Sequence, residues 1–468
     1  MYRQVTGGAC RLVLYRETAL KTPDSASGVL LAINSESFKS GANKKQSGVI
    51  RGKRGPGKPS RGLAQLSGGI ESPAYAPQMG HLFRALCGAP TTTEVAVVSC
   101  SAGPAVDKGG GFVGIPCAGH GYVQDDTVTI VGSTKYDGTY RVERGTTTDE
   151  LVIAAPYLAE TMTATMKVHR GRVARLKGAA AAGTTGKSVL PTSGLHGLQP
   201  GDSVTITGTT SYAGTYVLQA GTKERSLVIT KAFTAEAFDG TPTVAPKFYR
   251  HAFTLPPVQP SVCIEKVLDY EAGAAAKPVR RYLGCKVNSL GFKLGGDDQL
   301  TLSLDMVPLE EFAAPAPLLA SPAETPSVEF DNIESAIVIA GVRRGDIESG
   351  SVTCSFGVEA KAAVGDRGQY SRSSEGDPDI KAALTCFVES DELQLLSDAD
   401  ATVQFRAVIC GGDGDQFAFD LPEAELASEG AAITTKAGLM QDVQVMAFVD
   451  QAASVLSLTL INRVASYA

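Results

Sequence analysis

The chain has 468 residues, 43% of them hydrophobic and 20% charged, with 51 glycines, five histidines and no tryptophan. This composition describes a turn-rich globular protein of about two to four domains that is poor in the residues most used for catalysis, which favours β structure and argues against an enzyme. No stretch approaches the roughly 18 apolar residues of a membrane span, and the start lacks the apolar centre of a secretory signal, so we expect no membrane association.

The distribution of charge and the cysteines indicate how the protein associates and whether it contains disulfides or a zinc site. Residues 1–94 carry 13 basic and 5 acidic groups, whereas residues 248–468 carry 16 basic and 32 acidic groups. Opposite charges in two blocks suit head-to-tail self-association, although two solvated faces would give the same pattern. The nine cysteines are odd in number and contain no CxxC pair, so we expect reduced core side chains rather than disulfides or a zinc site.

Two short strands and a basic loop are expected at the start of the chain. Residues 10–16 and 28–34 are apolar runs bounded by turn residues, as in strands. Between residues 35 and 62 the apolar pattern lapses and eight cations stand against the single anion Glu36, which predicts a long basic loop outside the core. The cations are Lys39, Lys44, Lys45, Arg51, Lys53, Arg54, Lys58 and Arg61. A nucleic-acid contact is the competing interpretation, but no aromatic residues alternate with these cations to stack bases.

One short amphipathic helix is expected next. Residues 62–77 offer one more strand, and the following segment places Met79, Leu82, Phe83 and Leu86 at helical spacing. Gly88 and Pro90 then end the pattern.

An internal duplication occupies the middle of the chain. Residues 120–140 (HGYVQDDTVTIVGSTKYDGTY) return at 196–216 (HGLQPGDSVTITGTTSYAGTY) at a constant offset of 76, which also maps residues 151–153 onto 227–229. Alternating apolar and polar residues, tight turns and a third apolar run predict a small antiparallel barrel or sandwich in each copy. A repeated unit is an autonomous module, so the flanks can be read together as one interrupted domain.

The duplication therefore predicts the domain organisation. We expect one discontinuous domain of residues 1–94 and 248–468, with two inserted β modules at residues 95–175 and 176–247. The segment LKGAAAAGTTGK at residues 176–187 reads as a flexible linker between the modules.

The C-terminal flank is rich in strands. Nine runs of alternating apolar residues are expected to form an antiparallel sheet system with few helices. These runs are residues 284–294, 300–307, 334–342, 350–360, 381–389, 401–410, 415–426, 441–450 and 454–464.

Motifs for catalysis or metal binding are absent from the sequence. His120 and His196 are equivalent in the two copies, but no other ligand types recur beside them, so we expect turn-stabilising or surface histidines. The strings at residues 108–112 and 411–416 are incomplete matches to phosphate or calcium loops and are interpreted as turns. Adjacent acidic pairs, as at residues 297–298 and 310–311, fit solvated turns. The sequence predicts no catalytic, cofactor or metal site.

Six short phrases occur in order along the flanks. They are RETALKT at 16–22, the Arg-Gly-rich loop at 51–62, an SGG turn at 67–69, LCGAP at 86–90, GCKVNSL at 284–290 and LTLINRVASY at 458–467. None of them is a chemical signature, but their order along about two thirds of the chain resembles the tail tube proteins of long-tailed, siphovirus-like bacteriophages.

The resemblance implies a mainly β protein, a tail-tube β-sandwich or barrel with one short helix, interrupted by the two modules. It implies hexameric rings that stack into a hollow tube for DNA ejection, assembled in the host bacterial cytoplasm and found in the virion. Tail tip or baseplate, tape measure and tail terminator proteins would be its partners. The modules would decorate the exterior, and DNA would cross the lumen without tight binding, because a duct should not neutralise phosphates with Lys and Arg.

The basic loop gains a role from this resemblance. We expect its cations to reach the acidic C-terminal half of a subunit in a neighbouring ring, where they would set register and assembly rate. The alternative function is an adhesive or carbohydrate-binding virion protein in which the duplicated modules act together through multivalency.

Overall fold

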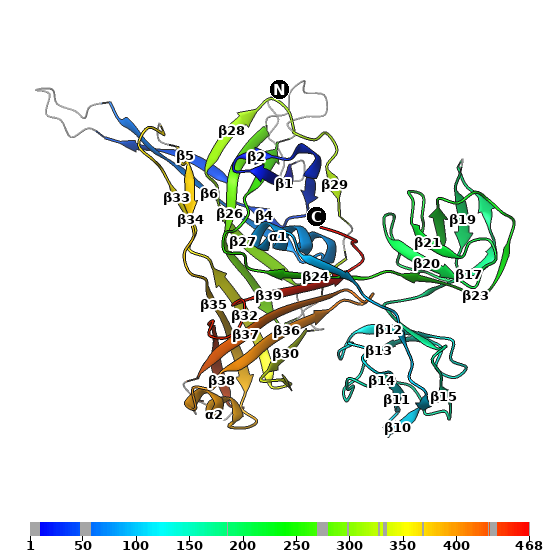
Figure 1. Ribbon diagram of the computed structural model, residues 1–468. Helices are drawn as coiled ribbons and strands as arrows, with labels where there is room; N and C mark the ends of the chain where they lie inside the picture. Colours follow the sequence, from blue (N-terminus) through cyan, green and yellow to red (C-terminus); the bar gives the residue numbers. More distant parts are fainter. Residues whose placement is uncertain are drawn as a thin grey trace, which may run out of the picture. The chain divides into compact units, whose positions relative to one another are not determined.

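The computed structural model describes residues 10–46, 58–184, 186–268, 279–296, 299–325, 328–330, 335–366, 369–428, 430 and 438–467. Antiparallel strands dominate these residues and only two α-helices occur among them, so the predicted mainly β class is confirmed. The chain forms two compact units (Figure 1). The first unit comprises residues 1–89, 253–407 and 419–458, and the second comprises residues 90–252, 408–418 and 459–468.

The first unit holds most of the long strands. Its N-terminal elements are β1 (Arg11–Ala19), β2 (Thr22–Pro23), β3 (Val29–Leu31), β4 (Ser35–Glu36), β5 (Lys39–Lys45), β6 (Ser60–Pro73) and α1 (Ala76–Cys87). Its later elements are β25 (Val262–Val267), β26 (Val279–Leu294), β27 (Thr301–Val307), β28 (Glu310–Ala314), β29 (Ala323–Glu324), β30 (Ser335–Ile339), β31 (Val342–Arg344), β32 (Ile347–Ser355), β33 (Glu359–Lys361), β34 (Arg372–Ser374), β35 (Asp379–Phe387), α2 (Glu392–Asp398) and β38 (Met440–Ala447).

Four strands contribute residues to both units, because the chain passes from one unit to the other within them. They are β24 (Tyr249–Thr254), β36 (Val403–Cys410), β37 (Gln416–Ser428) and β39 (Ser457–Asn462). Each of the nine runs predicted in the C-terminal flank contains a strand, because period-two alternation is a direct signature of a half-buried strand.

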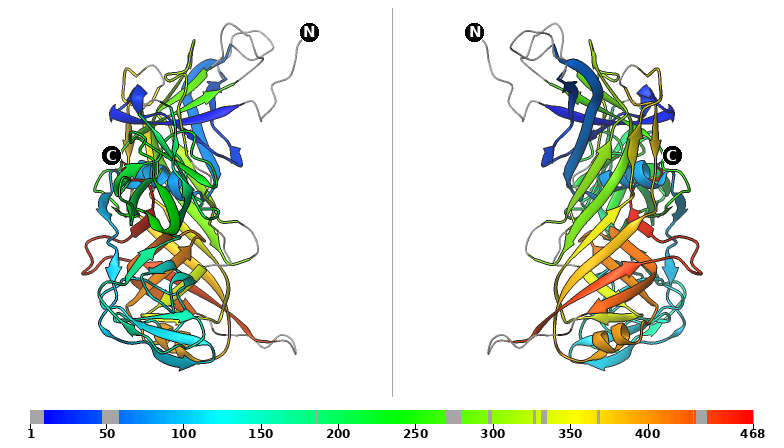
Figure 2. Two further views of the ribbon diagram at one scale, coloured as in Figure 1. Left: turned by 90° about the vertical axis from the view of Figure 1, so that its right-hand side faces the viewer. Right: turned by 90° about the vertical axis from the view of Figure 1, so that its left-hand side faces the viewer.

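Strand β26 pairs with four other strands of the first unit. Its first half pairs with β25 and β28, and its second half pairs with β27 and β32. Gly284 lies between the two halves at a φ of +63°, where a Cβ would meet the Leu309 side chain at 3.0 Å, so glycine allows the strand to change sheets. Beyond β32 the sheet continues through β35 to β38, and Figure 2 shows these strands side by side.

Helix α1 forms where the sequence predicts it. Pro77 lies in its first turn, and the Gly88 amide donates to the Arg84 carbonyl (2.8 Å) at a φ of +82°, which ends the helix. Gln78 fixes the helix to the residue after β3 and to β6, because its side chain accepts from the Ala32 amide (2.7 Å) and donates to the Ala32 carbonyl (2.8 Å) and to the Ser72 hydroxyl (2.5 Å). Helix α2 was not expected from the sequence. Among its residues only Leu393 is buried, so it lacks the apolar stripe by which α1 is recognised.

The basic segment is not a simple loop where the structure describes it. Strands β5 and β6 pair antiparallel from Lys39 opposite Ser67 to Lys45 opposite Ser60. Figure 1 shows this hairpin extending away from the rest of the first unit. The strand expected at residues 62–77 is found as β6, whereas residues 39–45 show no period-two apolar pattern because none of their described side chains is buried.

The second unit contains both copies of the duplication. After β7 (Thr91–Glu94), the first repeat consists of β8 (Val98–Ser99), β9 (Gly103–Pro104), β10 (Val106–Gly109), β11 (Phe112–Pro116), β12 (Thr127–Val131), β13 (Gly138–Arg141), β14 (Glu150–Ala154), β15 (Thr161–Met162) and β16 (Lys167–Arg170). The second repeat consists of β17 (Ala174–Ala179), β18 (Ala181–Ala182), β19 (Ser188–Pro191), β20 (Ser203–Thr207), β21 (Gly214–Val217), β22 (Ser226–Ile229) and β23 (Ala237–Pro246).

Each repeat has its own apolar core. Residues of the first core all lie between Cys100 and Val168, and those of the second between Ala174 and Val244. Val128 and Ile130 on β12 have counterparts in Val204 and Ile206 on β20, and all four are buried.

The predicted linker between the repeats is wrong. Half of residues 176–187 belong to β17 and β18, and β17 pairs with β23 inside the second repeat. Only residues 171–173 join β16 to β17. Small residues suggested a linker, but Gly178 (φ +109°) and Ala179 pair with β23, after a register shift between Arg175 and Lys177.

Equivalent tyrosines lock one loop in each repeat. The Tyr136 hydroxyl donates to the Leu158 carbonyl (2.6 Å) and accepts from the Leu158 amide (2.7 Å). The Tyr212 hydroxyl does the same with the Thr234 carbonyl (2.6 Å) and amide (2.9 Å). Both tyrosines are buried, whereas Leu158 and Thr234 are exposed, so each pair of hydrogen bonds ties an exposed loop to the core of its repeat.

We expect Tyr212→Phe to destabilise the second repeat by about 1–3 kcal/mol, because both Thr234 backbone groups lose their partner. Hydrogen exchange should show a faster Thr234 amide, with the β22 amides less affected. Tyr216→Phe is the control, since its hydroxyl makes only one exposed contact, to the Ala213 carbonyl at 3.4 Å. Equal effects of the two changes would contradict the locking role of Tyr212.

Candidate functional site

The structure places the described members of the predicted basic set along the β5–β6 hairpin. Lys39, Lys44 and Lys45 lie on β5, Lys58 precedes β6, and all four are exposed. Within the described ranges none of these four lysines forms an ion pair. Arg61 lies on β6, and its side chain is not among those described. Arg51, Lys53 and Arg54 lie outside the described residues.

The base of the hairpin is held by contacts that the sequence did not reveal. Glu36 forms an ion pair with Lys266 and accepts from the Phe38 amide (2.8 Å). The Phe38 ring is buried and lies 5.0 Å from the Tyr282 ring, centroid to centroid. A Cβ on Gly68 would overlap the Phe38 ring, so glycine is required there. The hairpin therefore leaves the first unit from a fixed base.

This packing corrects the expected turn at residues 67–69. Those residues lie inside β6, where Gly69 pairs with Asp305 of β27. A Cβ on Gly69 would come within 2.7 Å of an Asp305 carboxylate oxygen. The glycines thus serve close approach rather than a change of direction.

A groove of about 670 Å³ lies elsewhere in the first unit. Pro256, Pro257, Phe356 and Phe448 supply much of its apolar lining. Glu375 lies in its wall, where it accepts from the Gln259 amide (3.0 Å) and forms an ion pair with Lys286. Nothing in this groove resembles a catalytic arrangement.

The two histidines of the duplication stabilise turns. The Nδ1 atoms of His120 and His196 accept from the amides of Tyr122 and Leu198, both at 3.0 Å. Burial lowers the pKa of His196, which keeps its ring neutral. No metal-binding group of three or more ligands occurs among the described residues, and all nine cysteines are free thiols.

The turn at residues 411–416 has a structural role that its sequence did not indicate. In the first repeat, Asp126 forms a buried ion pair with Arg170 through two contacts of 2.8 and 2.7 Å. The side-chain Nε2 of Gln416 also donates to Asp126 (3.0 Å), and Arg170 donates to the Gly414 carbonyl (3.2 Å). Thr127 donates to the Gly412 carbonyl (3.1 Å).

The second repeat meets the same turn through the equivalent aspartate. Asp202 corresponds to Asp126 at the repeat offset, and it pairs with Arg463 at 3.1 Å. Arg463 also pairs with Asp413 of the turn (3.4 Å) and donates to the Gly197 carbonyl (2.9 Å). We call Asp126, Arg170, Asp202, Arg463 and residues 411–416 the clasp. It attaches both repeats to one turn of the second unit.

One carboxyl of the clasp is unusual. Asp415 is 3% exposed, and its Oδ2 atom has no hydrogen-bond partner. Burial raises the pKa of Asp415 to about 6, although the nearby Arg463 opposes the shift. Burial and the neighbouring Asp413 and Asp202 thus favour the neutral form of Asp415, whereas Arg463 and Arg170 favour the charged form.

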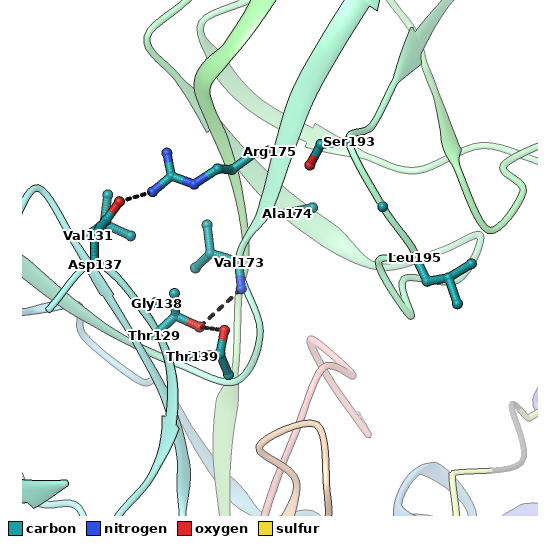
Figure 3. A pocket seen from close by; sticks show the side chains of 11 residues that line it. Thr129, Val131, Asp137, Gly138, Thr139, Val173, Ala174, Arg175, Ser193 and Leu195 are labelled. Atoms are coloured by element: carbon teal, nitrogen blue, oxygen red, sulfur yellow. Dashed lines mark hydrogen bonds and ion pairs between the residues drawn. The ribbon is translucent and has the colours of Figure 1, made fainter. Parts of the chain in front are cut away.

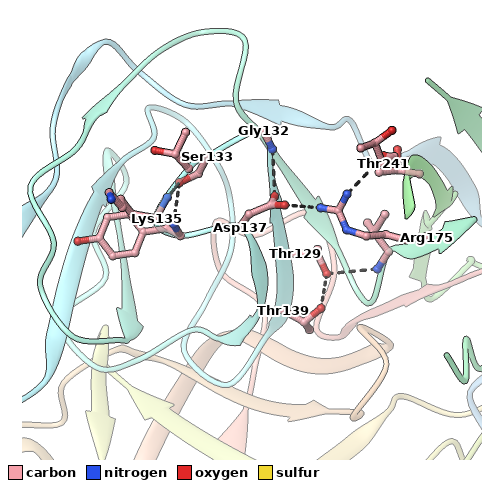
Figure 4. Close-up of polar contacts among 12 residues, drawn as sticks. Thr129, Gly132, Ser133, Lys135, Asp137, Thr139, Arg175 and Thr241 are labelled. Carbon is pink, nitrogen blue, oxygen red and sulfur yellow. Dashed lines mark hydrogen bonds and ion pairs between the residues drawn. The ribbon is translucent and has the colours of Figure 1, made fainter. Parts of the chain in front are cut away.

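A small pocket of about 200 Å³ lies at the junction of the two repeats (Figure 3). Arg175 of the second repeat forms an ion pair with Asp137 of the first, which also accepts from the Gly132 amide (3.0 Å; Figure 4). Thr129 joins the Thr139 hydroxyl (2.9 Å) and the Val173 amide (3.2 Å). Of these contacts, the Arg175–Asp137 pair joins the two repeats, and the Thr129–Val173 contact joins β12 to the residues between β16 and β17.

The model of the phage tail tube protein family matches residues 7–447. The chain belongs to this family. The tail tube part of the resemblance seen in the flanks is thereby confirmed, and the family is one of structural tail proteins. The tail tube protein is accordingly a virion component that assembles with other tail proteins. No curated protein matches the chain. Among its described residues no helix is long and apolar enough to span a bilayer.

We expect Arg170→Met to destabilise the first repeat of the tail tube protein by about 3–5 kcal/mol, because it leaves the Asp126 carboxylate buried and unpaired. Adding Asp126→Asn should recover part of that loss. Arg175→Met is the matched control, since the Arg175–Asp137 pair is about one-third exposed and should contribute about 1 kcal/mol or less. Hydrogen exchange of β12 and thermal unfolding report the result, and equal losses in the two single variants would contradict it.

Proposed function

We propose that the chain polymerises as stacked hexameric rings into the tail tube of a long-tailed, siphovirus-like phage and that this tube conducts DNA during ejection. Family membership supports a tail tube role. Closing strands of six subunits into a ring would remove exposed sheet edges, and stacking is a head-to-tail contact that continues until another protein caps it.

The observation that carries the stacking part of the proposal is the β5–β6 hairpin. A paired hairpin with a packed base and exposed lysines costs less to order at a contact than an unstructured loop. Its described lysines, Lys39, Lys44, Lys45 and Lys58, form no ion pair within the described part of the same chain, whereas residues 248–468 hold twice as many acidic as basic groups. The hairpin of one ring would therefore contact the acidic half of a subunit in the next ring.

The two repeats would decorate the outside of the tube. We keep the discontinuous tube domain at residues 1–94 and 248–468, with inserted modules at 95–175 and 176–247. The chain enters and leaves this insertion between paired strands, because Glu94 of β7 lies opposite Tyr249 of β24 and the Val95 amide donates to the Phe248 carbonyl (2.8 Å). A hairpin tip accepts an insertion without disturbing the ladder that precedes it.

The remaining partners follow from the tube. Tail tip or baseplate, tape measure and tail terminator proteins would bound it, and assembly would take place in the host bacterial cytoplasm. The lumen would be neutral or acidic, so that DNA crosses it without tight binding.

We expect Lys44→Glu with Lys45→Glu to slow or abolish tube formation while the subunit stays folded, because each exposed pair contributes about 0.2–1 kcal/mol and several act together in every ring. Negative-stain microscopy and light scattering measure assembly. Lys177→Glu with Lys223→Glu is the control, since both lysines are exposed in the second repeat. Normal tubes from the hairpin variant would refute the stacking role, and Lys53→Glu with Arg54→Glu tests the rest of the basic set.

We expect replacement of residues 95–248 by Asn-Gly to leave ring and tube formation intact, because this pair suits a two-residue hairpin turn between Glu94 and Tyr249. Thermal unfolding should show that the remaining chain folds, and microscopy should show tubes. A folded variant that stays monomeric at high concentration would show that the repeats are part of the scaffold.

A further inference from the structure

The two repeats share one exposed aromatic position. Tyr157 in the first repeat and Phe233 in the second are related by the repeat offset, and their exposed fractions are 43% and 45%. Other large exposed apolar side chains of the described repeats, such as Phe112 and Leu195, have no such counterpart. Neighbouring positions have also diverged, since Leu158 corresponds to Thr234.

Both aromatics stand on a loop that is fixed on two sides. The buried Tyr136 and Tyr212 hydroxyls hold the next residue of each loop, as described above. Three residues after each aromatic, Glu160 accepts from the Thr134 amide (2.8 Å) and Glu236 accepts from the equivalent Thr210 amide (2.7 Å). A ring presented on a fixed loop loses little conformational freedom when it binds.

These glutamates serve the loop rather than a ligand. Burial alone would raise the pKa of Glu160, but hydrogen bonds from Ser133, Thr134 and Lys135 lower it below its ordinary value. The pKa of Glu236 is lowered in the same way by Thr210 and Ser211. The carboxylates therefore stay ionised and keep the turn beside each aromatic in place, with the exposed Thr134 and Thr210 upon it.

We infer that Tyr157 and Phe233 are the stacking platforms of two equivalent saccharide sites, which bind the apolar face of a neutral pyranose ring. One exposed ring with small or aliphatic exposed neighbours, such as Leu158 beside Tyr157 and Ala232 beside Phe233, is too small for the apolar centre of a protein interface, which buries about 800 Å² per partner. It matches the size of one sugar ring, which combines an apolar face with hydroxyl groups at its edge.

The charges near the two positions favour a neutral sugar. Lys135 corresponds to Ser211, and Lys231 corresponds to Ala155, so the repeats share no cation that would recognise a phosphate, sulfate or carboxylate. Stacking at one ring gives weak binding, and two sites on each chain raise it by multivalency. A larger gain in affinity, from many subunits binding together, depends on the proposed tube, whereas the two saccharide sites of one chain do not depend on it.

The test uses the full chain with maltoheptaose, cellohexaose and chitohexaose as probes. Saturation-transfer NMR should detect contact with at least one of them. Tyr157→Ala with Phe233→Ala should weaken that binding by about fivefold to tenfold, as expected for loss of ring contacts. Phe112→Ala removes an exposed aromatic of the first repeat that has no counterpart, and it should leave binding unchanged.

Three outcomes would overturn the assignment: no transfer to any probe, equal binding by the double variant, or equal loss in Phe112→Ala. The assignment would also be overturned if the wild-type chain bound neutral phosphatidylcholine vesicles and the double variant did not, since the aromatics would then contact lipid. Tube formation is measured on the same samples by microscopy. Lost saccharide binding with intact tubes separates failure of these sites from failure of the proposed function.

Discussion

The antiparallel pairing of β26 is the interaction on which the first unit depends. A chain with two short helices among its described residues must satisfy most backbone groups between strands, and β26 does so with β25 and β28 on one half and β27 and β32 on the other. Because Gly284 lets one strand serve both sets, apolar side chains from distant parts of the sequence meet around it. The fixed base of the β5–β6 hairpin follows from this frame, since β6 pairs with β27.

A different interaction governs the second unit. Each repeat buries its own apolar core, but attachment to the turn at residues 411–416 relies on charged side chains taken out of water. Buried pairs of this kind contribute little net stability when complete and cost much when one partner is removed, so they favour one arrangement over others. The same aspartate performs this task in both repeats, although its arginine comes from β16 in the first and from beyond β39 in the second.

Local sequence patterns predicted strands and helix α1 more reliably than they predicted the segments that connect them. The alternation at residues 127–130 and 203–206 predicted strands, and the spacing of Met79, Leu82 and Phe83 predicted α1, because each pattern reports one buried face. The linker predicted at residues 176–187 was wrong because small residues occur in both linkers and strands. The hairpin at residues 39–45 gave no strand signal because it has little buried surface, and the role proposed for its cations stays a prediction.

The sequence by itself determined the mainly β class, the duplication and the family, because alternation, a constant offset and ordered phrases are properties of the chain alone. Tertiary structure decided what those features contact. It showed that Asp126 and Asp202 meet Arg170 and Arg463, that Gly68 makes room for Phe38, and that equivalent loops present Tyr157 and Phe233. The physical reason is that partners far apart in sequence are selected by packing and by desolvation of charges, and neither leaves a local period in the sequence.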